Sequence, residues 1–237
     1  MVLLWRLLFG HFLADFTFQT DYINIWKRSN LLGMLVHCVI HPLVYAVLVF
    51  PYLGDVWLEN EWVGFTGWQC VFFIFLLHLA EDLLRVLAIR RYRSLDNTWC
   101  FLWDQIVHVA TVFLLTPIAL AGGGEAVLIP EVWPVLGILL VLATHAGTIL
   151  IYFLERDLFA VGFPSPWEKF FTMSERLILC LLCMLPGRGW LLLAAGWLWL
   201  MYQARARRVF DASQFSLVVG ACVALMCGIA GRVLLAG

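Results

Sequence analysis

Long apolar runs constrain this chain more than any other feature of its sequence. A transmembrane helix needs about 20 mostly apolar residues. Eight segments have this character: Leu3 to Gln19, Leu31 to Tyr52, Val63 to Ala88, Cys100 to Ala121, Val132 to Leu154, Phe170 to Leu185, Trp190 to Tyr202 and Phe215 to Leu235. The first, sixth and seventh are short, and the sixth contains Glu175 and Arg176, so a half-helix is an alternative there.

The composition agrees with a membrane protein and excludes a soluble globule. The chain is 63% hydrophobic and 13% charged, whereas soluble domains carry about 25% charged residues. A formal net charge of -1 provides no basic surface, so we expect the lipid bilayer and no nucleic acid as a partner. No short apolar core precedes a small-residue cleavage site, so we expect no cleaved signal peptide. We predict an all-α, polytopic integral membrane protein with about eight transmembrane helices.

Lysine and arginine gather in alternate loops. One side holds Lys27, Arg28, Arg90, Arg91, Arg93, Arg156, Lys169, Arg205, Arg207 and Arg208. The other side holds Arg6, Arg188 and Arg232. By the positive-inside rule the first side is cytoplasmic, which predicts that both termini are periplasmic and that the number of spans is even.

A glycine turn, Gly122-Gly123-Gly124, marks the most natural internal boundary. It divides an N-terminal four-helix membrane unit, residues 1–121, from about four further helices in residues 125–237. We expect both parts to belong to one membrane domain.

Each of the first four segments carries two ionisable residues four positions apart. The pairs are His11 and Asp15, His37 and His41, His78 and Asp82, and Asp104 and His108. Residues i and i+4 share a helix face, and ionisable groups in hydrocarbon are costly unless they face one another, water or a ligand. Counted from the basic side, the pairs fall at one depth, in two layers about one turn apart. We therefore predict that they meet in a buried cluster; the alternative is a polar network that only fixes helix packing.

Imidazole and carboxylate groups on facing helices are how helix bundles build metal sites. All eight residues are candidate ligands of a divalent transition metal, with zinc as the first choice and iron or manganese as alternatives. They exceed the three or four protein ligands of one catalytic zinc. The pattern therefore predicts either a two-metal site or one metal with a carboxylate shell that orients the histidines.

Further polar residues extend the four stripes. We predict that Gln19, Arg85 and Gln105 contact a substrate, because they continue the faces of Asp15, Asp82 and His108. For Arg85, snorkelling to the interface or pairing with Asp82 is an equal alternative. In the second half of the chain His145, Glu155 and Glu175 are second-tier candidates, because their spacing forms no pairs and packing roles explain them as well.

The first segment contains Gly10-His11-Phe12-Leu13-Ala14-Asp15-Phe16, followed by Gln19-Thr20 and Lys27. This motif resembles the opening signature of a bacterial membrane family labelled domain of unknown function thirty-three-oh-seven. The later pairs match further motifs of that family in the same order, over about the first half of the chain. Glu81-Asp82-Leu83-Leu84-Arg85 departs from the pattern, with arginine where the family pattern has lysine. The resemblance implies a bacterial inner membrane and supplies no activity; a more distant likeness is to membrane-bound metal-dependent hydrolases.

Three functions fit these patterns. The first is a metal-dependent hydrolase that acts from the cytoplasmic side on a lipid-linked or phosphate-containing substrate, with Asp82 or Asp104 as general base. The second is a carrier or channel for metal ions or protons, which would need polar residues through both leaflets. The third is a cofactor-binding or assembly subunit of a larger membrane complex, with histidines as axial haem ligands.

Overall fold

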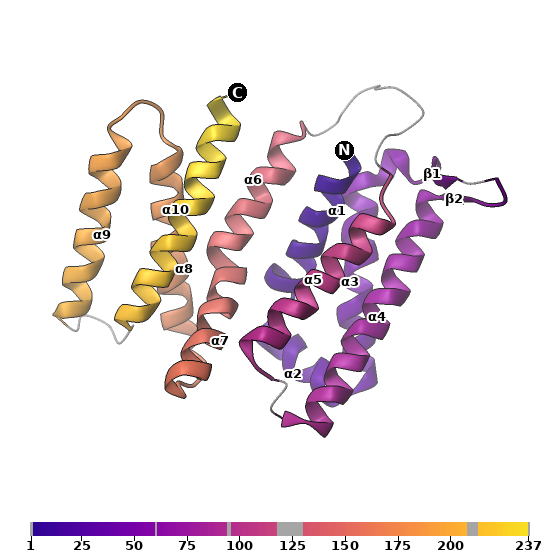
Figure 1. Ribbon diagram of the computed structural model, residues 1–237, viewed down its shortest axis with the longest axis horizontal. Coiled ribbons are helices and arrows are strands. Elements are labelled where there is room, and N and C mark those ends of the chain that lie inside the picture. The colour runs from indigo at the N-terminus through magenta and orange to yellow at the C-terminus, as the bar shows by residue number, and fades with distance from the viewer. Residues whose placement is uncertain (1, 60, 94–95, 118–129, 208–212, 237) are drawn as a thin grey trace. The chain divides into compact units, whose positions relative to one another are not determined.

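The computed structural model describes residues 2–59, 61–93, 96–117, 130–207 and 213–236, most of them in helices (Figure 1). The chain divides into two compact units, Met1–Val135 and Leu136–Gly237, which are described separately. The glycine turn at residues 122–124, the end of the fourth predicted segment and Arg208 lie outside the described residues.

The N-terminal unit is built from long helices joined by short elements. Its elements are α1 (Val2–Phe12), the π-helical η1 (Leu13–Thr17), α2 (Asp21–Ser29), α3 (Leu31–Val49), the 3-10 turn η2 (Phe50–Tyr52), β1 (Val56–Glu59), β2 (Gly64–Thr66), α4 (Gly67–Arg91) and α5 (Thr98–Leu114). Helix α3 packs against α1, α2 and α4, while α5 packs against α4 and α1. The helices that carry the four ionisable pairs are therefore direct neighbours.

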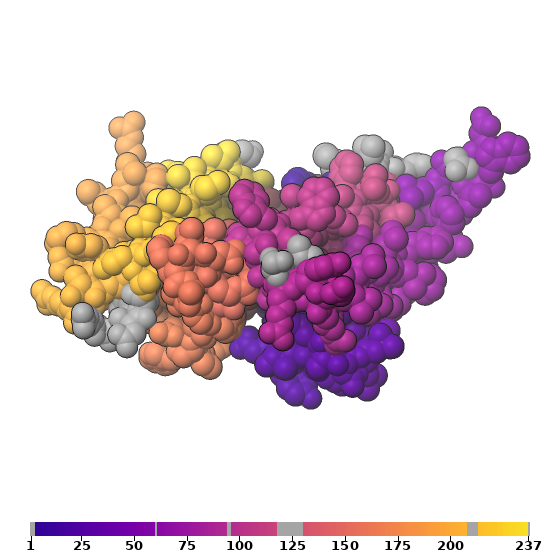
Figure 2. Space-filling view, turned by 60° about the horizontal axis from the view of Figure 1, so that its bottom comes forward, coloured from indigo at the N-terminus to yellow at the C-terminus, as the bar shows by residue number. Residues whose placement is uncertain are grey.

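A β-hairpin precedes α4, which corrects the expectation of an all-helical chain. Strands β1 and β2 pair in antiparallel fashion, and the hairpin protrudes from the surface of its unit (Figure 2). The third predicted segment begins at Val63, but the helix begins at Gly67, because Thr66 forms a capping box with Gln69. The Gln69 side chain accepts a hydrogen bond from the Thr66 backbone N–H at 2.8 Å.

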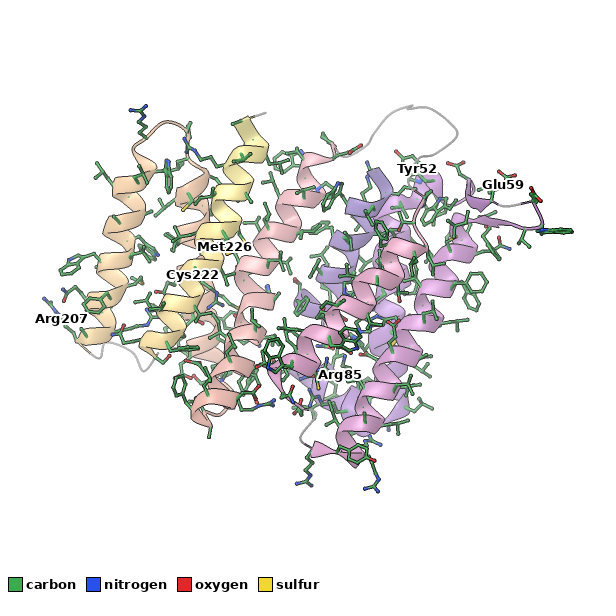
Figure 3. The ribbon with its side chains drawn as sticks, viewed as in Figure 1. Tyr52, Glu59, Arg85, Arg207, Cys222 and Met226 are labelled. Atoms are coloured by element: carbon green, nitrogen blue, oxygen red, sulfur yellow. The ribbon has the colours of Figure 1, made fainter. Side chains whose placement is uncertain are left out.

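An apolar core occupies the half of the N-terminal unit that contains the hairpin. Its buried members are Leu3, Leu4, Leu7, Tyr45, Val49, Leu53, Trp57, Cys70, Val71, Ile74 and Val112. Figure 3 shows Tyr52, which packs against this core, and Arg85 toward opposite ends of the same unit. The apolar core therefore lies beside the ionisable pairs, on the side that faces the hairpin.

The C-terminal unit contains helices alone among its described residues. They are α6 (Val132–Val141), which begins just before the division, the π-helical η4 (Leu142–Ala146), α7 (Gly147–Phe159), α8 (Pro166–Met184), α9 (Trp190–Ala206) and α10 (Gln214–Ala236). Helix α8 packs most extensively against α10, and also against α9. It begins four residues before the predicted Phe170, because Ser165 and Glu168 form a capping box around Pro166.

Each of the eight predicted apolar segments is helical over most of its length. Three stretches of the described chain are long and apolar enough to cross a membrane: Leu31–Tyr52, Val132–Phe159 and Gln214–Ala236, with mean hydropathies of 2.1, 2.1 and 2.2. These helices indicate insertion in a membrane. The total of eight spans and the periplasmic location of the termini stay predictions.

Candidate metal centre

The four ionisable pairs converge inside the N-terminal unit. All five of their histidines are buried, with no residue more than 2% exposed. The carboxylates of Asp15 and Asp82 are buried beside them, at 6% and 3% exposure. This arrangement follows from the packing of α1, α3, α4 and α5, each of which directs one polar stripe toward its neighbours.

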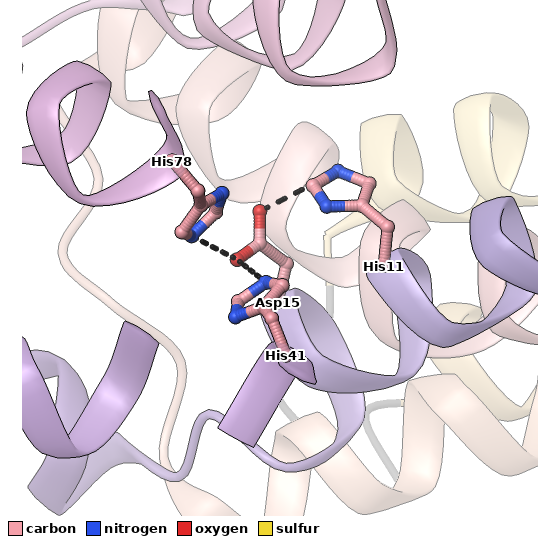
Figure 4. Close-up of side chains that lie close together, drawn as sticks. All are labelled: His11, Asp15, His41 and His78. Carbon is pink, nitrogen blue, oxygen red and sulfur yellow. Dashed lines mark ion pairs between the residues drawn. The ribbon is translucent and has the colours of Figure 1, made fainter. Parts of the chain in front are cut away.

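Asp15 lies at the centre of the histidines (Figure 4). Its Oδ1 atom lies 3.2 Å from His41 Nε2, 3.3 Å from His37 Nε2 and 3.7 Å from His78 Nε2. Its Oδ2 atom lies 3.7 Å from His11 Nε2. A single carboxylate thus faces imidazoles from three helices, α1, α3 and α4.

A π-helical turn places Asp15 in this position. The Phe18 N–H donates to the Leu13 carbonyl at 2.8 Å, a bond that spans five residues instead of four. Single π turns within α-helices are frequent at functional sites, because the wider turn re-aims the side chains that follow it. Gln19 lies beyond the end of η1 and does not extend its helical face, although its Oε1 atom is buried without a hydrogen bond among the described residues.

A second carboxylate, Asp82, is paired with a lysine that the spacing argument did not place in the site. Lys27 on the surface helix α2 donates from Nζ to Asp82 Oδ2 at 3.0 Å. The same oxygen lies 3.2 Å from His37 Nε2, and Oδ1 lies 3.7 Å from His108 Nε2. In the sequence Lys27 stood out as one of the basic residues of the predicted cytoplasmic side and as part of the motif that resembles the family signature.

The third carboxylate, Asp104, is paired with Arg85 in a close ion pair. Arg85 thus pairs with Asp104 and not with Asp82, the alternative weighed from spacing. Its guanidinium also lies over the Phe101 ring, 5.8 Å from the ring centroid. Gln105 bridges two carboxylates, because its Nε2 atom donates to Asp15 Oδ2 at 3.3 Å and to Asp104 Oδ2 at 3.4 Å.

Glu81 is the second residue that the spacing argument missed. Its Oε2 atom lies 2.5 Å from His108 Nδ1, and its Oε1 atom accepts a hydrogen bond from Thr111 Oγ at 2.6 Å. Glu81 is three residues after His78, a spacing that also shares a helix face and could have drawn attention to it. The two contacts fix the orientation of the His108 ring.

Several ring nitrogens in this cluster have no hydrogen bond from the described part of the chain. They are Nδ1 and Nε2 of His11 and His41, Nδ1 of His37 and Nε2 of His108. Buried polar atoms are rarely left without partners, so such orphans indicate a bound ion or water. Imidazole nitrogens together with carboxylate oxygens are the donor set of zinc and related transition metals.

Four groups of side chains in the described residues bring potential ligand atoms within 4.8 Å of one another, so they could hold a metal ion. The groups are His11 with Asp15, His41 and His78; His37 with His78 and Asp82; His78 with Glu81 and His108; and Asp82 with Asp104 and His108. Only the first offers three imidazoles and a carboxylate, and all four of its members are buried.

The second-tier candidates belong to the C-terminal unit and have partners there. Glu175 forms a bidentate ion pair with Arg205, at 2.7 Å for both contacts. Glu155 accepts a hydrogen bond from Ser213 Oγ, and His145 Nδ1 lies 3.2 Å from Thr144 Oγ.

Comparison with known proteins identifies the N-terminal unit. The family described as "Protein of unknown function (DUF3307)" matches residues 3–131. The chain belongs to the DUF3307 family. No curated protein and no solved structure matches it. The DUF3307 region contains every residue of the candidate metal centre, and the family match confirms the resemblance seen in the sequence.

Proposed function

We propose that the DUF3307 region binds one divalent transition metal ion, zinc in the first place, through His11, Asp15, His41 and His78. In this proposal the protein is a metal-dependent hydrolase in a bacterial inner membrane, with eight spans and periplasmic termini. Its substrate is lipid-linked or carries phosphate, and it enters from the cytoplasmic side. The distribution of lysine and arginine supports this orientation.

The observation that carries the proposal is the burial of the Asp15 carboxylate without a lysine or arginine partner among the described residues. This carboxylate is buried in the membrane unit and, among the described residues, has only imidazoles and the Gln105 amide around it. A buried carboxylate without a cation is strongly disfavoured. A metal ion held by Asp15 together with His11, His41 and His78 would supply that positive charge.

The cations of the site favour one metal ion over two. A second group, formed by Asp82, Asp104 and His108, has ligand atoms close enough for another ion. Lys27 and Arg85 already neutralise its two carboxylates. We therefore assign this second group to the surroundings of the metal ion and to the substrate.

A bound metal ion would supply a Lewis acid that polarises water or the substrate. His108 is the residue best placed to accept a proton, because Glu81 holds Nδ1 and leaves Nε2 without a hydrogen bond in the described chain. Asp82 and Asp104, the bases expected from the sequence, are weaker candidates because each faces a cation. Arg85 and Gln105 remain the residues proposed to position a substrate anion.

The contrast between the two halves of this unit disfavours an ion path. A carrier or channel needs polar groups through both leaflets. The residues that follow His41 on α3 and precede His78 on α4 instead join the buried apolar core through Tyr45, Val49 and Ile74. This distribution suits a site that opens to one side.

Metal content tests the binding proposal directly. We expect detergent-purified protein to retain about one equivalent of a transition metal, and His41→Ala to retain at least tenfold less. His145→Ala is the matched control, because His145 lies on η4 in the C-terminal unit. Equal metal content in the two variants, or none in the unaltered protein, would refute the assignment.

Hydrolysis is tested separately with a phosphodiester probe, bis(p-nitrophenyl) phosphate. We expect release of p-nitrophenol by metal-loaded protein, loss of release after chelation and recovery when zinc is added back. If the loaded protein binds metal but releases no p-nitrophenol, the metal site stands and the hydrolase assignment is rejected for phosphodiesters.

A further inference from the structure

A polar cavity of about 330 Å³ lies in the C-terminal unit, outside the DUF3307 region. Its lining residues come from α7, the segment between α7 and α8, the first part of α8 and the start of α10. Its volume is in the range of sites for small molecules. The lining residues include Glu155, Gly162, Glu168, Thr172, Arg176 and Ser213.

Arg176 is a buried cation in the wall of this cavity, only 3% exposed. Its Nε atom donates to the Ala143 carbonyl at 2.8 Å and its Nη2 atom to the Thr144 carbonyl at 3.1 Å. Both carbonyls belong to η4, where the π turn leaves backbone acceptors in need of partners. Nη2 also donates to Thr148 Oγ. Every one of these acceptors is neutral.

No carboxylate within the described chain forms an ion pair with Arg176. Its neighbour Glu175 is engaged by Arg205 in the bidentate pair. The carboxylates of Glu155 and Glu168 line the same cavity without reaching the guanidinium. Arg176 makes no hydrogen bond through Nη1 to any described residue, so this donor is available. A buried guanidinium without a counter-ion indicates a missing anion, and phosphate matches its donor geometry.

The two carboxylates indicate a second group on the same ligand. Glu155 accepts a hydrogen bond from Ser213 Oγ, and Glu168 Oε2 accepts one from the Ser165 N–H at 2.7 Å. Each carboxylate can accept further bonds. A ligand with one anionic group and one ammonium group would satisfy both the cation and the carboxylates of the cavity.

Exposed aromatic side chains place this cavity at the level of lipid headgroups. Phe159, Phe163, Trp167 and Phe170, at or between the adjoining ends of α7 and α8, are all more than 40% exposed. Arg156 and Lys169 lie over aromatic rings at the same end, so both kinds of residue found at membrane interfaces are present. Aromatic belts mark the boundary between hydrocarbon and water.

We propose that this cavity binds a zwitterionic phosphoamine, such as the headgroup of phosphatidylethanolamine. The phosphate lies against Arg176 and the ammonium group against Glu155 and Glu168. The proposal is independent of the metal centre, because every residue it uses lies in the C-terminal unit.

Gly162→Trp tests the proposal without altering Arg176. Gly162 lines the cavity, and an added Cβ would meet no atom within 4 Å, so a tryptophan there adds bulk at the cavity without displacing the backbone. Gly196→Trp is the matched control, because Gly196 on α9 also has open space around it but lies outside the cavity. Arg176→Gln removes the charge directly, although it also removes support from η4.

The measurement is lipid retention by native mass spectrometry, after exchange into detergent with equal amounts of phosphatidylethanolamine, phosphatidylglycerol and phosphatidylcholine. We expect the unaltered protein and Gly196→Trp to retain phosphatidylethanolamine at least tenfold over the other two lipids. We expect Gly162→Trp and Arg176→Gln to lose this preference. Equal retention by both tryptophan variants, or no preference in the unaltered protein together with no competition by O-phosphoethanolamine, would overturn the proposal.

Soluble probes then distinguish the source of the headgroup. Displacement of the lipid by O-phosphoethanolamine at comparable concentration would identify a free phosphoamine as the ligand. Retention of the lipid against it would identify the membrane as the source. Displacement by inorganic phosphate as effective as by O-phosphoethanolamine would contradict the role of the ammonium group.

Discussion

The three aspartates of the metal centre differ in what neutralises them. Asp82 faces Lys27 and Asp104 faces Arg85, whereas Asp15 faces imidazoles and an amide. The difference assigns separate tasks to residues of the same type. A carboxylate already paired with a fixed cation contributes to the local field, while one that lacks a cation is the natural ligand of a metal ion.

Replacement of Lys27 tests this division. Lys27→Met leaves the Asp82 carboxylate buried without its cation, so we expect the free energy of unfolding to fall by about 3 kcal/mol. The added substitution Asp82→Asn should restore most of the loss. Denaturation in detergent measures both variants against Arg93→Met, at an exposed position just beyond the end of α4. Equal stability of Lys27→Met and Arg93→Met would contradict a buried ion pair.

Glu81→Gln tests whether Glu81 orients the His108 ring or binds the metal ion. Glu81 contacts His108 and Thr111 and lies outside the proposed ligand set. We expect metal content to stay unchanged while release of p-nitrophenol falls by about 10- to 100-fold, the usual effect of removing a group that orients a catalytic histidine. Loss of metal from this variant would show instead that His108 and Glu81 belong to the ligand set.

Helices and their ends follow from local sequence, but their internal irregularities do not. The apolar runs predicted helices at all eight positions, and Asn30, Thr66, Asn97 and Ser165 cap four of them. The π turns at η1 and η4 could not be predicted from the sequence, because the backbone hydrogen bond shifts by one residue while the pattern of side chains stays that of an α-helix. Spacing along one helix could have pointed to Glu81, but it could not give the pairing of Glu81 with His108 or of Lys27 with Asp82, because each pair joins different helices.

Close helix packing in the C-terminal unit depends on glycine. A Cβ added at Gly228 on α10 would lie 2.6 Å from the Cys180 carbonyl oxygen on α8, a backbone atom that cannot move aside. We expect Gly228→Ala to lower the free energy of unfolding by about 1 to 3 kcal/mol, as overpacking does. Gly196→Ala, where the added methyl meets open space, should have no such effect. Thermal unfolding in detergent compares them, and equal stability would contradict this close contact.

At the scale of the whole molecule, the family match and the division of the fold nearly coincide. Residues 3–131 match DUF3307, and the first compact unit ends at Val135. The C-terminal unit therefore lies wholly outside the matched region. Glu175 and Arg176 were visible in the sequence as charges in an apolar segment. Their partners, Arg205 for Glu175 and the η4 carbonyls for Arg176, required the fold.

Orientation in the membrane is predicted by charge and can be measured by thiol labelling. In a variant without the seven native cysteines, we expect Trp62→Cys in the hairpin to react with an impermeant maleimide added outside intact cells. Arg91→Cys at the end of α4 should react only after permeabilisation. Both positions are exposed, so access to the thiol depends on the side of the membrane. The reverse labelling pattern would show that the predicted orientation is wrong and that the end of α4 lies outside.

The π turn at η1 has a consequence for how the metal centre is encoded. Each residue of an α-helix turns the chain by about 100°, so removing Ala14, which precedes Asp15, would leave an ordinary helix of nearly the same composition with Asp15 rotated away from the histidines. The centre is thus specified by the number of residues between His11 and the end of the helix as much as by their identity. A single-codon deletion there would act as a point mutation of the metal centre, even though it removes none of the ligands.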